Sequence, residues 1–267
     1  MTLKTDQFER KGKNMQDKIA SLEERLNALE KDNKRLHAIQ DVTNVISKMA
    51  YFQECGAFVD RYHCLASKTP GVSVEVGCRG VFEGYEHCYY TMVTHEENFV
   101  KAHAEGVRKT YPDREFENEH SGMLESSVIG TPVIEVAEDG ETVRGQWMAL
   151  MIMAKSRGEA PESGFVWWKI AADFVQEDGK WKVWHLRMDP MTTGPFNDFA
   201  VNSLNMPEPQ KPGAEWKNQH VAGANATWPH PDKPVTEMYY TYRPWTTAHN
   251  YPTPPEPYKT FDEVENW

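Results

Sequence analysis

The stretch "DFVQEDGKWKVWHLR", residues 173–187, decides the fold because it has the pattern of a β-hairpin. The Asp-Gly pair at 178–179 supplies the positive φ angles that a two-residue turn needs, and aliphatic and aromatic residues flank it as strands require. If the turn has two residues, Glu177 pairs with Lys180 and the other pairs follow outward. The sequence therefore predicts a hairpin whose second strand carries His185.

In this register His185 faces Ala172 on the more apolar side of the hairpin. Because side chains alternate along a strand, that side carries Trp168, Ile170, Ala172, Phe174, Trp181, Val183, His185 and Arg187. An apolar wall with a few convergent polar groups is typical of a small-molecule pocket. A lone histidine on an apolar side is more often a core residue with one hydrogen bond, so the residues alone leave both interpretations open.

The rest of the chain predicts helices first and long strands afterwards. Helical spacing covers 41–65, and strand patterns follow at 72–77, at 131–154 around a second Asp-Gly turn, and at 165–175. This order is typical of an α+β domain in which a curved antiparallel sheet packs on helices.

Before that domain, residues 15–40 carry a heptad pattern. The a positions are Ile19, Leu26 and Asn33, and the d positions are Met15, Leu22, Leu29 and Leu36. We expect a long N-terminal helix over 1–40 that associates with other copies as a coiled coil. The alternative is an amphipathic helix packed on its own domain, but the stripe is narrow and begins before any globular pattern.

After Pro190 the composition changes to prolines with aromatic residues between them. Proline has no backbone N–H group to donate to a neighbouring strand and it disrupts the interior of a helix. Residues 191–267 are therefore predicted to form an extended arm. Because a disordered tail would contain fewer aromatic residues, we expect this arm to dock on its own domain or on a neighbouring subunit.

Charge and composition limit the partners. The 267-residue chain has a net charge of -11, which disfavours nucleic acid. No apolar run is long enough to cross a bilayer, so we expect no membrane partner and a cytoplasmic protein. The four cysteines (Cys55, Cys64, Cys78 and Cys88) lie far apart and are expected to be free thiols. No spacing of His, Asp or Glu indicates a metal site.

The segments "GTPVIEVAEDGETVRGQW" (130–147) and "DFVQEDGKWKVWHLRMDP" (173–190) resemble the closing strands of the SnoaL-like group in the nuclear transport factor 2-like superfamily. "VSVEVGCRGVFEGYEHC" (72–88) resembles an earlier strand and the turn that follows it. The resemblance covers about residues 40–190 and places the domain at 41–190. It implies a cone formed by a bent antiparallel sheet and helices, and a homo-oligomer, either a dimer or a trimer.

Active members of this group, which include polyketide cyclases, scytalone and bile-acid dehydratases and ketosteroid isomerase, work without a cofactor. They move protons next to a carbonyl with a carboxylate or a histidine and tyrosine donors. The resemblance thus implies a cofactor-independent lyase or isomerase, most simply a dehydratase, acting on a hydrophobic cyclic or aromatic (polyketide-, steroid- or phenol-like) molecule. The alternative is a non-catalytic oligomer of the same fold that binds such a ligand.

Carried over to this chain, the resemblance assigns His185 as general base and Tyr51 as proton donor. An aspartate often follows that tyrosine in the group, and here Glu54 is the nearest carboxylate. A histidine often precedes the "TPVIEV" strand, where this chain has Ser126 and Ser127. The nearest histidine is His120, which is therefore the third catalytic candidate.

The remaining candidates would contact the substrate rather than react with it. Trp167 and Trp168 would wall the pocket and Arg187 would bind a polar group. Glu75 could supply a carboxylate, as could Glu54, although alternation does not tell which side Glu75 faces. Three further histidines lie in a polar helical stretch and are expected to be solvated: His87, His95 and His103.

Overall fold

The computed structural model describes residues 2–77, 79–118, 121–156, 161–196, 230–236, 247 and 250–264. Side chains are described within these ranges except at 2–13, 155–156 and 161–162. The elements are α1 (Thr2–Glu54), α2 (Phe58–Tyr62), β1 (Ser73–Val76), β2 (Gly80–Glu83), α3 (Tyr85–Tyr89), the π-helical turn η1 (Tyr90–Thr94), α4 (His95–Thr110), β3 (Leu124–Val136), β4 (Thr142–Ser156), β5 (Pro161–Glu177), β6 (Lys180–Pro195) and the short 3-10 helix η3 (Phe261–Glu263).

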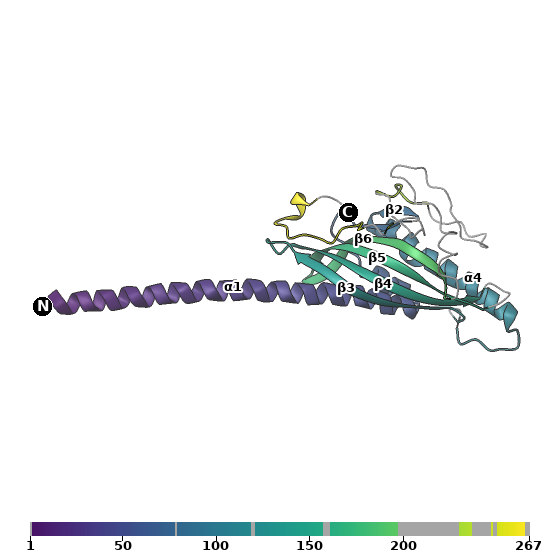
Figure 1. The fold of residues 1–267 in the computed structure, drawn as a ribbon, viewed down its shortest axis with the longest axis horizontal. Coiled ribbons are helices and arrows are strands. Elements are labelled where there is room, and N and C mark those ends of the chain that lie inside the picture. The colour runs from purple at the N-terminus through teal and green to yellow at the C-terminus, as the bar shows by residue number, and fades with distance from the viewer. Residues whose placement is uncertain are drawn as a thin grey trace.

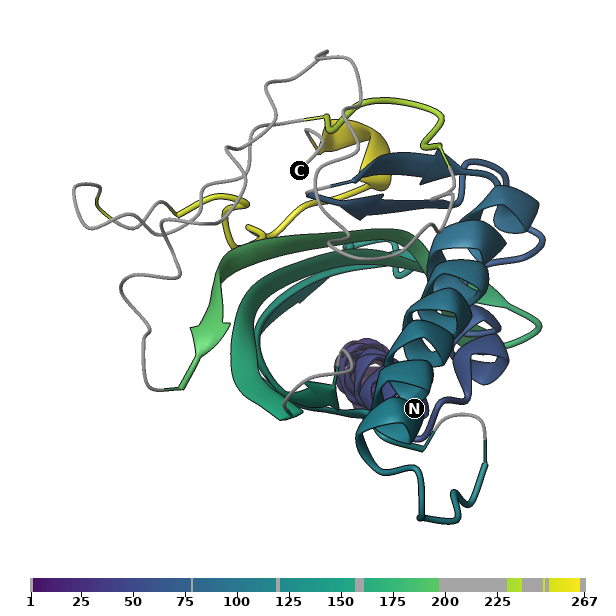
Figure 2. The same ribbon diagram turned by 90° about the vertical axis from the view of Figure 1, so that its right-hand side faces the viewer.

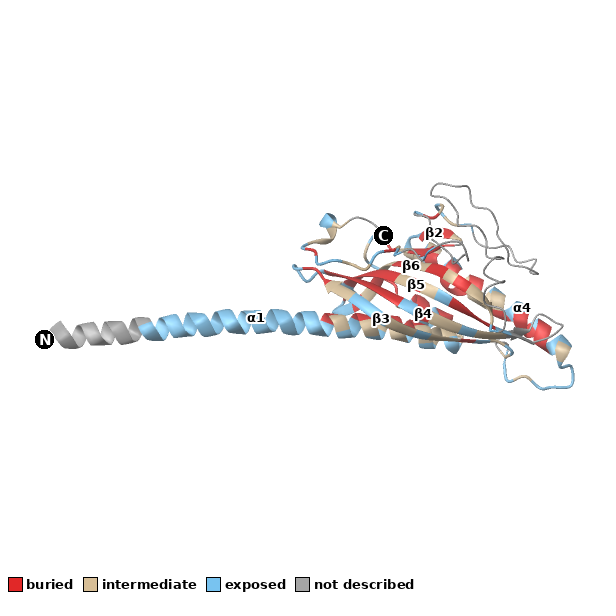
Figure 3. Ribbon diagram, viewed as in Figure 1, coloured by how far each residue is buried: buried red, intermediate tan, exposed pale blue. Residues whose placement is uncertain are grey.

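One continuous helix, α1, contains both the heptad pattern and the helical pattern that follows it (Figure 1). No glycine or proline interrupts residues 14–54, so nothing in the sequence ends the first helix before the second begins. The described side chains are exposed up to His37, and the helix then becomes amphipathic (Figure 3). Its buried stripe consists of Ala38, Val42, Ile46 and Met49.

The sheet has six strands in the order β2-β1-β6-β5-β4-β3. All neighbouring strands are antiparallel except β1 and β6, which are parallel. The sheet curls around the C-terminal part of α1, and α4 lies across the open side of the curl (Figure 2). The predicted α+β fold with a curved sheet and a long N-terminal helix is therefore confirmed.

The core fills the concave face of the sheet. Side chains of α1 meet inward-facing strand residues there, among them Val143, Trp147, Phe174, Val183 and Leu186. Because side chains alternate, the intervening residues of β4, β5 and β6 point to the convex face. That face carries buried charged residues instead: Arg144, Lys169, Asp173, Arg187 and Asp189.

The predicted hairpin turn is present between β5 and β6. Asp178 and Gly179 have φ angles of 52° and 71°, and the pairs from Glu177–Lys180 to Phe174–Val183 follow the predicted register. Beyond them the prediction is wrong, because a β-bulge at Trp184 shifts the pairing by one residue. His185 pairs with Asp173 rather than with Ala172, so it points to the convex face, opposite to the side predicted for it.

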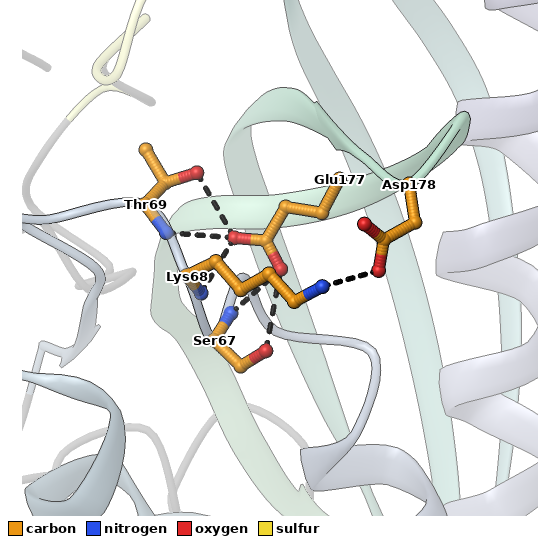
Figure 4. Close-up of polar contacts among 5 residues, drawn as sticks. All are labelled: Ser67, Lys68, Thr69, Glu177 and Asp178. Atoms are coloured by element: carbon orange, nitrogen blue, oxygen red, sulfur yellow. Dashed lines mark hydrogen bonds and ion pairs between the residues drawn. The ribbon is translucent and has the colours of Figure 1, made fainter.

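The turn is also tied to the loop that follows α2 (Figure 4). The Glu177 carboxylate accepts hydrogen bonds from the backbone N–H groups of Ser67, Lys68 and Thr69 at 3.0, 2.8 and 2.8 Å. The Lys68 ammonium donates to Asp178. Burial raises the pKa of Glu177, but the N–H donors outweigh it and lower that pKa to about 2.

The described C-terminal segment, residues 250–264, lies on the convex face of the sheet (Figure 2). Lys169 Nζ donates to the Tyr251 carbonyl oxygen at 3.1 Å, and Gln146 donates to that of Pro252. The Tyr258 hydroxyl lies 3.0 Å from Thr142 Oγ1. Residues 191–195 belong to β6 and much of 197–249 lies outside the described residues, so the extended arm over 191–267 stays a prediction.

Candidate functional site

A cavity of about 210 Å³ lies where the end of α1 meets α2, α4 and the start of β3. Its walls mix apolar and polar residues: Gln53, Glu54, Cys55, Gly56, Phe58, Val100, Glu117, Asn118, Ser121, Met123 and Glu125. Gly56 has a φ of 74°, a left-handed conformation that ends α1 and turns the chain into α2. This turn places the last side chains of α1 opposite the start of β3.

A buried polar cluster forms one wall of this cavity. Glu125, which is 7% exposed, accepts a hydrogen bond from Gln53 Nε2 at 2.6 Å. Gln53 Nε2 also lies 3.3 Å from Glu96 Oε2, and its Oε1 accepts from Arg61. Arg61 in turn donates to the Met92 carbonyl oxygen at 2.8 Å and lies 3.5 Å from Glu96.

The cluster holds Glu125 in one orientation. Arg61 has only N–H donors, so the Oε1 atom of Gln53 must face it. The NH₂ group of Gln53 then faces the carboxylates of Glu96 and Glu125, and Arg61 thus fixes the orientation of the Gln53 amide. Arg61 is 8% exposed and offsets part of the charge of the two glutamates. A carboxylate fixed in this manner beside an open volume is equipped to accept a proton from a bound molecule.

The α4 histidines are not solvated as predicted. His95 and His103 are 3% and 4% exposed because they lie on the core side of the helix, where Phe99 packs between them. The ring of His103 hydrogen-bonds to the Phe99 carbonyl oxygen at 2.7 Å. Burial strongly lowers the pKa of His95, so this imidazole is neutral near pH 7. His87 is partly buried, and its Nδ1 hydrogen-bonds to the Asp232 carboxylate.

The structure places His185 in a charged array on the convex face. Its Nδ1 lies 2.9 Å from Asp173 Oδ2, and Asp173 Oδ1 accepts from Arg144 Nε at 2.8 Å. The imidazole stacks on Trp184 with ring centres 4.1 Å apart and lies near Phe261 from the C-terminal segment. The side chain is 25% exposed. His185 is thus part of a carboxylate–imidazole pair, outside the apolar interior that the sequence indicated.

Two of the predicted substrate-binding residues, Arg187 and Glu75, lie on the same convex face. Arg187 Nε donates to Asp189 at 2.9 Å, and its Nη1 lies 3.2 Å from the Tyr251 hydroxyl. Burial raises the pKa of Asp189 to about 6, against the lowering effect of Arg187. The Glu75 carboxylate accepts from the backbone N–H and the hydroxyl of Thr236 at 2.9 and 2.7 Å.

The other predicted site residues are dispersed. Trp168 packs against the core on the concave face, whereas Trp167 is 39% exposed and Tyr51 is 71% exposed. Glu54 lines the cavity. His120 lies outside the described residues.

The sequence reasoning missed the other members of the site. Two of them lie next to positions that the family resemblance singled out. Glu125 directly precedes Ser126 and Ser127, which stand where the family often has a histidine, and Gln53 directly precedes Glu54, the carboxylate nearest to the expected aspartate. No sequence pattern pointed to Arg61 or Glu96, because these residues reach Gln53 only through the packing of α2 against η1 and α4.

Among the residues that the structure describes, no group of three or more His, Cys, Asp or Glu side chains could hold a metal ion. Within the same ranges, no helix is long and apolar enough to span a membrane. The described cysteines are free thiols, with Cys55 exposed, Cys64 partly buried and Cys88 buried.

Residues 90–187 match the SnoaL-like domain family. The match runs from η1 to the middle of β6 and so includes α4, the cavity-lining Glu125 with Glu96 of the same polar cluster, and His185 on the convex face. No curated protein sequence matches the chain.

Solved structures of similar shape include a putative scytalone dehydratase from Novosphingobium aromaticivorans, at 9% identity and a TM-score of 0.44, covering 62% of this chain and 91% of that one. The hexachlorocyclohexane dehydrochlorinase LinA-type3 from Novosphingobium barchaimii has 12% identity, a TM-score of 0.44 and coverage of 63% and 96%. ActVI-ORFA from Streptomyces coelicolor has 10% identity, a TM-score of 0.41 and coverage of 58% and 97%. Similarity at this level carries no functional argument.

Proposed function

Because the chain is a SnoaL-like protein of the nuclear transport factor 2-like superfamily, we propose that it is a cofactor-independent lyase or isomerase that acts by acid–base catalysis on a hydrophobic cyclic molecule. The observation that carries the proposal is the Glu125 carboxylate at the wall of the cavity, oriented by Gln53 and, through it, by Arg61. Within this reaction class we favour a dehydratase.

In the proposed reaction Glu125 removes a proton from a carbon next to a carbonyl group. The electron pair of that C–H bond forms a double bond, the C–O bond of a neighbouring hydroxyl breaks, and the hydroxyl leaves as water after receiving a proton. In an isomerase Glu125 would instead return its proton to another carbon. Gln53 holds the carboxylate still during either transfer, which removes the cost of reorienting it.

The proton donor to the leaving hydroxyl is proposed from the sequence. His120 is the first candidate, since Asn118 and Ser121 on either side of it line the cavity. Tyr51, the donor that the family resemblance implies, is largely exposed on the outer side of α1. We therefore rank His120 above Tyr51.

The size of the cavity limits the substrate. A cavity of about 150 Å³ is sufficient for benzene, so 210 Å³ suits a molecule, or the reacting part of one, with a single ring. The apolar side chains of Phe58, Val100 and Met123 would contact the ring, while Glu54 and Asn118 could bind its polar substituents. This favours a phenol-like ring over a fused polycyclic one.

His185 stays a candidate base at a second location. The supporting observation is its pairing with Asp173, since a carboxylate at Nδ1 fixes the orientation and the tautomer of the ring and leaves Nε2 to accept a proton. Trp184 and Phe261 supply flat apolar surfaces beside it.

The experiment is a screen of hydroxylated single-ring carbonyl compounds for loss of water, followed by substitution of the candidate bases. Glu125→Gln should lower turnover by about 10²- to 10⁴-fold, the usual contribution of a general base. Glu117→Gln is the matched control, because Glu117 lines the same cavity outside the polar cluster. Thermal melting would check that both variants are folded.

The other outcomes separate the alternatives. Normal turnover in Glu125→Gln with loss in His185→Gln would move the chemistry to the convex face. Normal turnover in both variants would refute both assignments. Calorimetric binding of ring compounds without any turnover would favour the non-catalytic binding protein.

A further inference from the structure

The heptad positions of α1 expose a continuous apolar seam. Six aliphatic side chains along it are between 48% and 66% exposed: Met15, Ile19, Leu22, Leu26, Leu29 and Leu36. A continuous apolar row at alternating steps of three and four residues is typical of a helix that pairs with another helix, because exposed apolar surface of this extent is unfavourable in water. The six side chains, together with Asn33, are called the seam below.

The seam lies on the side of α1 opposite to its own domain. At about 100° per residue, Asn33 and Val42 differ by nine residues and hence by about 180° around the helix axis. Val42 is the centre of the stripe that packs in the concave sheet, with 0% exposure. The domain therefore cannot cover the seam without bending the helix, and α1 is straight between the two stretches (Figure 1).

The charges beside the seam complement a second copy in parallel orientation. In a parallel, in-register pair each g residue meets the e residue five positions later on the other helix. Here Lys18 would meet Glu23 and Arg25 would meet Glu30 of the second copy. In an antiparallel pair, e positions face e positions and g positions face g positions. Glu23 and Glu30 would then face glutamates, and Lys18 and Arg25 would face cations.

We propose that residues 15–36 of two copies of this chain form a parallel, in-register, two-stranded coiled coil. Leucine at most d positions and a single Asn at a, where Asn33 would meet its counterpart, favour two strands over three. The paired stretch is about 33 Å long. Because α1 is anchored in the folded domain at its C-terminal end, the cost of nucleating the helix is already met there.

The first experiment measures the mass of the 267-residue chain in solution by light scattering. Leu22→Asp/Leu29→Asp should halve the mass of the assembly. The matched control is Ser21→Asp/Ala28→Asp, which adds the same charges at the same spacing one position away, on the outer side of the helix. An unchanged mass in the seam variant, a single-chain mass in the parent protein, or a three-chain mass would each overturn the proposal.

The second experiment tests orientation. Asn33→Cys should give a covalent dimer under mild oxidation, because equivalent a positions lie within disulfide reach in a parallel pair and far apart in an antiparallel one. Lys34→Cys, on the outer side, is the control, and the parent protein gives the background from its exposed Cys55. Cross-linking of Asn33→Cys no greater than these two would overturn the parallel register.

The third experiment tests the charges. Lys18→Glu/Arg25→Glu should weaken dimerisation severalfold at low salt, because it places four pairs of glutamates opposite one another. Adding Glu23→Lys/Glu30→Lys should restore it. Equal dissociation constants for all three proteins would overturn the proposed pairing of charges. None of these substitutions touches the cavity, so turnover reports on the proposed function separately.

Discussion

Replacing Glu177 by Gln removes the charge that holds the loop after α2 to the β5–β6 turn. The carboxylate accepts three backbone N–H groups and also the hydroxyls of Ser67 and Thr69, at 3.3 and 2.9 Å (Figure 4). Glutamine has the same shape but only one acceptor oxygen, and its NH₂ group would face N–H donors. Part of this set of hydrogen bonds must therefore be lost, and those that survive become bonds to a neutral group.

The pKa gives the size of the effect. A fall from the ordinary value of 4.5 to about 2 corresponds to about 3 kcal/mol, at about 1.36 kcal/mol per pKa unit. Because the folded-state pKa is the lower one, this stabilisation is present above pH 4.5 and is lost as the pH falls through about 2. Glu177 is 7% exposed, so solvent screens little of it.

Urea unfolding at pH 7 should show Glu177→Gln to be less stable by about 3 kcal/mol, with Glu105→Gln on the exposed side of α4 as the control. Between pH 4.5 and pH 2 the parent protein should lose about that amount more than Glu177→Gln does. Equal stability at pH 7, or parallel acid dependence of the two proteins, would refute the reasoning that the N–H groups bind the charged carboxylate.

Gly80→Ala should lower the free energy of unfolding by about 2 kcal/mol or more, since φ is +114° and the new Cβ would lie 2.6 Å from a backbone oxygen; Gly140→Ala, also at positive φ but in open space, should cost less in the same urea titration. Asp173→Asn should destabilise the protein by about 3 kcal/mol because a buried arginine loses its charged partner, and a melting curve within a degree of the parent's would contradict this. Cys88 should react with a thiol reagent at pH 8 only on unfolding, because burial raises its pKa to about 12, whereas exposed Cys55 should react in the native protein; a thiol assay with and without denaturant distinguishes them.

The hairpin shows where sequence reasoning succeeds and where it ends. The Asp-Gly turn is a local signal, so both the turn and the first pairs were predictable. The bulge at Trp184 has no local signal. Its indole donates to the Pro70 carbonyl oxygen at 2.8 Å and packs on Phe261, and these two partners lie in segments distant from the hairpin. Distant contacts thus decide which face His185 occupies.

The cavity shows the same division. The sequence pointed to the end of α1 through Glu54 and to the start of β3 through the serines after Glu125, and both places line the cavity. It did not reveal that Gln53 and Glu125, 72 residues apart, hydrogen-bond to each other. That contact depends on how the sheet curls around α1, which strand periodicity alone does not determine.

The continuity of α1 has a mechanical consequence. Gln53 and Glu54, at one end of the helix, border the cavity, and the exposed leucines lie several turns away on the same element, with no glycine or proline between them. A helix without such a break bends only gently along its length. The exposed leucines are therefore held at a fixed distance and direction from the cavity, with no hinge in the helix between them.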